Sequence, residues 1–185
     1  LLLYILFGMD NRHRRQIKDE DLGRLKGITE ITQSDDILSE MPVPQKPLAD
    51  MLRKMNKSFL LSGNDVEIIT DFQTMSDRLI ADIEGARHHI NMLFFKFEDD
   101  AAGRRIADAL IRKSEEGVLV RLIYDDAGNL MVPRRFYRKL RKHGIQVRGF
   151  IRIFLPILSR DYNSRNHRKV VVIDGKTGYM GGMNI

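Results

Sequence analysis

The sequence contains no cysteine, and this absence excludes two classes of structure. Neither a disulfide framework nor a thiolate metal site can form, which suits a protein of a reducing compartment. Histidine and carboxylate residues do not cluster with the spacing of metal ligands either. We therefore expect neither a metal nor any other cofactor.

Long apolar runs are also missing: none reaches the about 20 residues that are needed to cross a bilayer. The longest apolar stretch at the start is Leu1–Phe7, and a basic cluster, Arg12–Arg15, follows it. That order is typical of the cytoplasmic edge of a membrane helix. We interpret residues 1–8 as the end of such a helix, the alternative being a buried strand or an amphipathic end.

The chain has 185 residues, of which 43% are apolar and 30% are charged, with a formal net charge of +6. This composition predicts one globular domain with a core and a polar extension, not a disordered chain. A positive net charge favours binding to polyanions or to an anionic membrane face over binding to acidic protein partners. The chain opens without an initiator methionine and stops inside an expected strand, so we expect it to be a piece of a longer protein.

Residues 9–58 are polar and weakly periodic, and we interpret them as a juxtamembrane region and linker. Prolines at 42, 44 and 47 predict an extended stretch, followed by a short helix over 48–56. Residues 59–185 alternate between strand and helix patterns. Strands are expected at 66–69, 90–97, 118–124 and 145–150, and helices at 71–86, 101–116 and 133–143. The alternation predicts an α/β fold, a mixed β-sheet flanked by helices, with the functional site at the strand tips.

The most informative segment is 163–184. His167 and Lys169 are two residues apart, so on a strand both side chains point to one face. The apolar run after Lys169 continues the strand, Asp174-Gly175 begins a turn, and the chain returns as a paired strand. Gly181 and Gly182 leave room where a substrate or another backbone approaches closely.

The residue types in this segment fit phosphate transfer. The imidazole of His167 can attack phosphorus, and the ammonium of Lys169 can neutralise phosphate oxygens. The carboxylate of Asp174 can hold the imidazole in one tautomer, and Asn184 offers a neutral donor. A lone His-x-Lys would more simply be a surface histidine, but the complete spacing favours a site.

This segment resembles the HKD motif of the phospholipase D superfamily. The stretches 166–175 and 181–185 resemble those of bacterial cardiolipin synthases in particular, and the likeness extends upstream through 90–97 and 103–126. The resemblance implies that His167, Lys169 and Asp174 are catalytic. By the same resemblance, Asn166, Gly182 and Asn184 bind the substrate.

The resemblance also implies a reaction. A histidine attacks the phosphodiester of phosphatidylglycerol, releases glycerol and holds the phosphatidyl group as a phosphohistidine. The hydroxyl of a second phosphatidylglycerol then takes that group to form cardiolipin. The family uses two facing HKD motifs, so residues 59–185 would be the first, incomplete lobe of two. The second lobe would come from the same chain or a dimer partner, on the cytoplasmic side of the cell membrane.

Two alternatives stay open at this point. The chain could belong to a phospholipase or nuclease of the same superfamily, or it could be an inactive fragment that binds anionic lipid. We expect no nucleic acid partner. The basic helix at 133–143 fits either lipid attraction or a solvated face. Asp125 and Asp126 are expected to cap a turn, and Phe94 and Phe95 to lie in the core.

Overall fold

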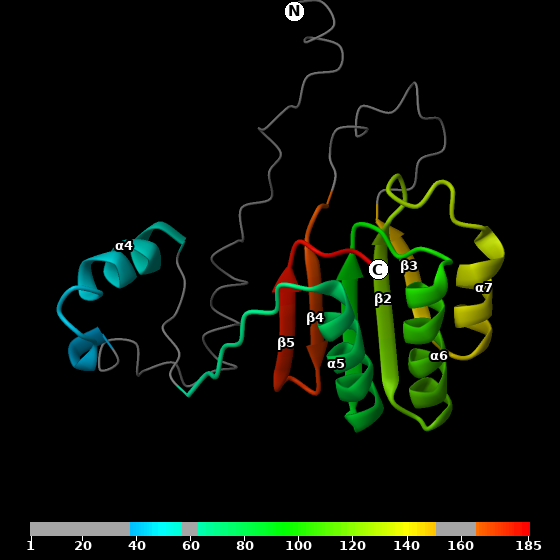
Figure 1. The fold of residues 1–185 in the computed structure, drawn as a ribbon, viewed down its shortest axis with the longest axis horizontal. Coiled ribbons are helices and arrows are strands. Elements are labelled where there is room, and N and C mark those ends of the chain that lie inside the picture. The colour runs from blue at the N-terminus through cyan, green and yellow to red at the C-terminus, as the bar shows by residue number, and fades with distance from the viewer. Residues whose placement is uncertain (1–37, 57–62, 151–165) are drawn as a thin grey trace, which may run out of the picture. The chain divides into compact units, whose positions relative to one another are not determined.

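The computed structural model describes residues 38–56, 63–150 and 166–185, which divide into two compact units. The described residues up to Ile68 belong to one unit and those from Ile69 onward to the other. The first unit contains helix α4 (Lys46–Asn56) (Figure 1). The interpretation of residues 1–8 lies outside the described residues. Within the described ranges, no helix is long and apolar enough to cross a membrane.

Two expectations for the region before Ile69 are wrong. The proline-rich stretch is a turn, not an extended segment, because the amide of Gln45 bonds to the carbonyl of Pro42 at 2.9 Å and α4 begins at Lys46. Proline is tolerated in the first turn of a helix, where amides lack partners anyway. The strand expected at 66–69 is not formed, and Val66 and Ile68 are more than 80% exposed. Apolar residues alone do not make a strand without a neighbour to pair with.

The second unit is built on a five-stranded sheet with the order β3-β2-β1-β4-β5 (Figure 1). Its strands are β1 (His89–Phe94), β2 (Leu119–Asp125), β3 (Gln146–Phe150), β4 (Lys169–Ile173) and β5 (Thr177–Gly181). The first three strands are parallel, whereas β4 runs antiparallel to β1 and β5 antiparallel to β4. The mixed sheet and the β4–β5 hairpin confirm the predicted fold class.

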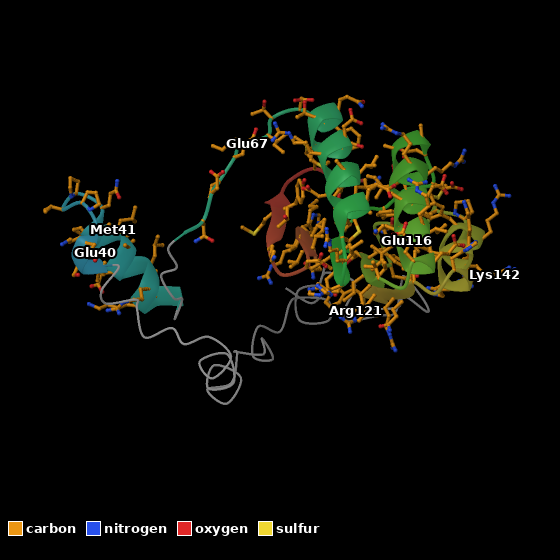
Figure 2. The ribbon with its side chains drawn as sticks, turned by 90° about the horizontal axis from the view of Figure 1, so that it is seen from below. Glu40, Met41, Glu67, Glu116, Arg121 and Lys142 are labelled. Atoms are coloured by element: carbon orange, nitrogen blue, oxygen red, sulfur yellow. The ribbon has the colours of Figure 1, made fainter. Side chains whose placement is uncertain are left out.

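Three helices lie on one face of this sheet (Figures 1 and 2): α5 (Phe72–Gly85), α6 (Ala101–Glu115) and α7 (Arg134–Lys142). The alternation along β2 reflects this one-sided cover, because Val120 and Leu122 are buried while Arg121 and Ile123 are exposed. Asp71 and Asp100 cap α5 and α6 by accepting from amides three residues on. Gly117 and Gly144 follow α6 and α7 at positive φ, a common ending of helices.

The strand directions decide which residues meet at each end of the sheet. The carboxyl ends of β1, β2 and β3 lie at one edge, and β4, being antiparallel, begins at that same edge. The residues just before β4, the residues after β1 and the turn after β2 therefore meet there. We call this the upper edge of the sheet, as it appears in Figure 1.

Candidate active site

His167 lies at the upper edge, two residues before β4, with its imidazole stacked on the ring of Phe95. The ring centroids are 4.1 Å apart and the planes differ by 15°. The Nζ of Lys169 lies 5.5 Å from the centroid of the same phenyl ring and donates to the carbonyl of His167 at 2.8 Å. The two motif side chains thus lie together at Phe95, as expected from their spacing. His167 is exposed, which leaves its ring open to a substrate.

Phe95 was expected in the core, and the structure corrects this. Phe94 is buried, but Phe95 is only half-buried and forms the floor under the imidazole. Burial alternates along β1 and Phe94 is on the buried face, so the next residue, Phe95, falls on the half-buried face. Sequence reasoning missed Phe95 because an aromatic pair at a strand end is usually core.

The segment before β4 is held in place by the buried carboxylate of Asp125, which is 1% exposed. One oxygen accepts from the amide of Asn166 at 3.2 Å, and the other accepts from the amides of Ala127 and Gly128 at 3.0 and 3.1 Å. The prediction that Asp125 caps a turn is confirmed. The same carboxylate also ties the turn after β2 to the chain entering β4, which the sequence did not reveal.

Asn129 is a second buried organiser, 5% exposed, that sequence reasoning missed. Its Oδ1 accepts from the amide of Phe97 at 2.8 Å. Its Nδ2 donates to the carbonyls of Phe95 and Asp125, at 2.7 Å each. An asparagine in a glycine-containing turn is commonly a solvent-exposed turn former, so no sequence signal marked it. In the fold it joins the ends of β1 and β2 beneath the site.

Gly128 allows Phe95 to lie close to this turn. A Cβ at position 128 would come within 2.5 Å of the carbonyl oxygen of Phe95 and 3.2 Å of its ring. Side chains do not fit at such distances, so a larger residue would displace the floor of the site. This glycine is required for close approach, not for backbone conformation.

The three residues expected to bind substrate lie at the same edge but differ in their contacts. Asn184 follows β5, and its Oδ1 accepts from the amide of Lys96 at 3.1 Å. Within the described ranges its Nδ2 has no partner and can donate to a ligand. Asn166 uses its Oδ1 locally, accepting from the amide of Arg168 at 3.2 Å. A Cβ on Gly181 or Gly182 would meet no described atom within 4 Å. No described part of the backbone therefore approaches either glycine closely.

Asp174 lies elsewhere, and its expected contact with the imidazole is wrong. It follows β4, seven residues beyond His167, about 23 Å away along an extended chain. Its Oδ1 accepts from the amides of His88 and His89, and its Oδ2 from that of Arg87, all at 2.8 Å. The amides of His89, Arg87 and His88 lower the pKa of Asp174 to about 2. Asp174 therefore clamps the lower end of β4 to the start of β1.

No group of three or more histidine, aspartate or glutamate side chains within residues 38–56, 63–150 and 166–185 is arranged to hold a metal ion. The chemistry that these residues offer is an exposed imidazole, a nearby ammonium and a free amide donor at one edge. That set suits attack on, and charge neutralisation of, a phosphate group.

Residues 79–185 match the family model described as "Cardiolipin synthase, PLD-like domain". The major cardiolipin synthase ClsA of Bacillus subtilis (strain 168) is 35% identical over 193 aligned residues, covering 100% of this chain and 40% of the relative. A cardiolipin synthase of Staphylococcus aureus (strain Mu50) is 36% identical, covering 95% of this chain and 35% of the relative.

Among solved structures, NucT from Helicobacter pylori aligns with a TM-score of 0.47 and 24% identity, over 60% of this chain and 68% of that chain. The chain spans less than half the length of the cardiolipin synthases that it matches. The family match covers more than half of this chain and includes both His167 and Lys169. The chain belongs to the cardiolipin synthase, PLD-like domain family.

Proposed function

We propose that this chain supplies one half of the active site of a cardiolipin synthase, an enzyme that moves a phosphatidyl group between two phosphatidylglycerol molecules. The observation that carries the proposal is the pairing of His167 and Lys169 over Phe95 at the upper edge. Family membership and the names of the relatives support the choice of lipid chemistry over other phosphate transfers.

In the first step, a ring nitrogen of His167 forms a bond to the phosphorus of one phosphatidylglycerol. The bond from phosphorus to the glycerol oxygen breaks, and a general acid protonates the departing glycerol. In the second step, the hydroxyl of another phosphatidylglycerol loses its proton to the same group and attacks phosphorus. The bond between nitrogen and phosphorus then breaks, which yields cardiolipin and restores the imidazole.

The general acid would be the histidine of a second HKD lobe, supplied by the same protein or by a dimer partner. The two histidines can exchange roles, with His167 as acid and base and its counterpart as nucleophile. Lys169 would neutralise the phosphate oxygens in either case, because its charge lies beside the imidazole. The Nδ2 of Asn184 would donate to one of those oxygens, and Gly182 and Asn166 would shape the space around the phosphate.

Asp174 would contribute from a distance. Three amides from the start of β1 fix its carboxylate, which sets the position of β4 against β1 and so the position of Lys169 and His167. It would be a positioning residue and not a proton carrier. Substrate and enzyme would meet at the cytoplasmic face of the cell membrane.

The test uses the full-length protein that contains this chain, with vesicles of phosphatidylglycerol as substrate. Cardiolipin and free glycerol should form in equal amounts, and His167→Ala should abolish both. Phosphatidic acid in place of cardiolipin would instead identify a phospholipase and overturn the transferase proposal. Arg168→Ala serves as the matched control, because Arg168 is an exposed neighbour whose side chain forms no hydrogen bond or ion pair with the described residues.

A further inference from the structure

A tight turn after β2 displays two large apolar side chains to solvent. Leu130 is 57% exposed and Met131 is 94% exposed, and they occupy the middle of a turn closed by a 3.0 Å bond from the amide of Val132 to the carbonyl of Asn129. Scattered exposed apolar residues need no explanation, but an adjacent pair at the tip of a turn presents a small apolar surface.

The base of this turn is held firmly. Asn129 is buried and makes three hydrogen bonds to the backbone beneath the site, and Val132 packs against the hydrophobic core. Leu130 and Met131 thus project from a fixed base, so burying them in a partner would cost little backbone entropy.

Exposed positive charge lies next to the apolar pair. Helix α7 begins at Arg134 and has no acidic residue in its first turn. Within the described ranges, Arg134, Arg135 and Arg138 are exposed and form no ion pair. Farther along α7, Lys139 pairs with Asp108 and Arg141 donates to the carbonyl of Val147. Arg134 and Arg135 are the cations of α7 nearest the turn.

The geometry points to an anionic lipid surface as the partner of this region, which we name the docking edge: Leu130, Met131, Arg134, Arg135 and Arg138. The apolar pair would enter the boundary between head groups and acyl chains, and the arginines would contact lipid phosphates. The inference rests on the proposed function for its choice of a lipid. Nucleic acid fits less well, since the docking edge has no aromatic side chain for base stacking.

The docking edge lies at the same end of the sheet as His167. The turn and the start of α7 lie at the upper edge, where His167 also lies, whereas Lys142 lies at the far end of α7 (Figures 1 and 2). A bilayer against the docking edge would face the side of the sheet that carries the imidazole. A substrate head group would then reach His167 without leaving the membrane.

The sequence has no tryptophan, so a single introduced tryptophan reports on one position. In the 185-residue chain, Met131→Trp should show a blue-shifted tryptophan emission when vesicles that contain phosphatidylglycerol are added. Brominated acyl chains in those vesicles should quench this emission. Pure phosphatidylcholine vesicles should have a much weaker effect. The matched control is Gln146→Trp, at an exposed and neutral position at the start of β3 on the opposite edge, which should show neither change.

Charge removal completes the test. In the Met131→Trp background, Arg134→Gln and Arg135→Gln should each weaken vesicle binding roughly fivefold, equivalent to ~1 kcal/mol per cation. Equal quenching at positions 131 and 146, or no quenching at 131 in chains that circular dichroism shows to be folded, would overturn the docking edge. A spectral change with duplex DNA but not with vesicles would overturn it as well. Insertion at 131, together with a full-length protein that makes no cardiolipin, would refute the proposed function alone.

Discussion

The imidazole of His167 lies flat against Phe95, with the two ring centroids 4.1 Å apart. This contact gives an exposed histidine a defined orientation without a carboxylate partner among residues 38–56, 63–150 and 166–185. Because Lys169 lies near the same phenyl ring, one aromatic side chain supports both motif residues. The upper edge is therefore organised from β1 as well as from β4.

Replacing Phe95 with leucine should lower the turnover of the complete enzyme while leaving it folded. A stacked aromatic pair is worth about 1 kcal/mol, which corresponds to a loss of roughly fivefold in rate. Phe95→Tyr keeps the ring and should retain most of the activity. Steady-state transfer rates, read with thermal unfolding curves, would measure this. Equal activity of the leucine and tyrosine variants would show that the stack has no role in the reaction.

Lys169→Met should be nearly as harmful as His167→Ala, whereas Arg168→Ala should be mild. Lys169→Met removes the ammonium that donates to the carbonyl of His167, whereas Arg168→Ala removes an exposed side chain that forms no hydrogen bond or ion pair with the described residues. Transfer rates of the three variants should be compared after circular dichroism confirms their folding. If Arg168→Ala proved as harmful as His167→Ala, the assignment of the catalytic residues would have to be abandoned.

Asn129→Ala should destabilise the domain by about 3 kcal/mol, because it leaves buried backbone groups of Phe95, Phe97 and Asp125 without partners. Asn91→Ala is the matched control. Asn91 is half-buried and accepts one 3.3 Å bond from Arg121, so its loss should cost less than about 1 kcal/mol. Urea unfolding would compare the two variants. Similar midpoints would mean that Asn129 does not organise the strand ends.

Asp174→Asn should change how stability depends on pH. The folded pKa of Asp174 is about 2, below its usual value of 3.8, because the amides of His89, Arg87 and His88 bond to the charged form. Because its pKa is lowered by folding, charged Asp174 stabilises the fold when the pH is above the usual pKa. This contribution to stability disappears as the pH falls from about 4 through about 2. The native protein should therefore lose stability relative to Asp174→Asn across that window.

Thermal unfolding of both proteins between pH 2 and pH 7 would test the Asp174 prediction. Asparagine is a suitable replacement because residue 174 has a φ of 52°, which asparagine tolerates better than most residues. Other carboxylates titrate in both proteins, so only the difference between the curves reports on Asp174. A constant difference across the range would contradict the clamp.

The 185-residue chain alone should form no cardiolipin from phosphatidylglycerol vesicles, since it carries one HKD motif where the family uses two. Turnover should match that of its His167→Ala variant. Activity above that control in a monomer, as judged by sedimentation, would contradict the need for a second motif. Activity confined to dimers would instead show that a second copy can supply the missing histidine.

The periodicity and spacing of residues sufficed to predict most of the helices and strands, because these elements depend mainly on local sequence patterns. The apolar repeat of α5 and the His-x-Lys alternation were each legible in a short window of the sequence. The strand expected at 66–69 failed for the opposite reason. A strand depends on a neighbour distant in sequence, and the local pattern does not report whether that neighbour exists.

What the sequence by itself determined is the chemistry: an imidazole and an ammonium two residues apart at the start of a strand. Only the tertiary structure decided what surrounds them. Asp174 belongs to the motif in sequence, yet a five-residue strand carries it to the far edge, where it binds the start of β1. Phe95 is distant in sequence, yet the antiparallel pairing of β1 and β4 places it beneath the imidazole. Distance along an extended strand and pairing between strands set these contacts, and neither can be read from spacing in the motif.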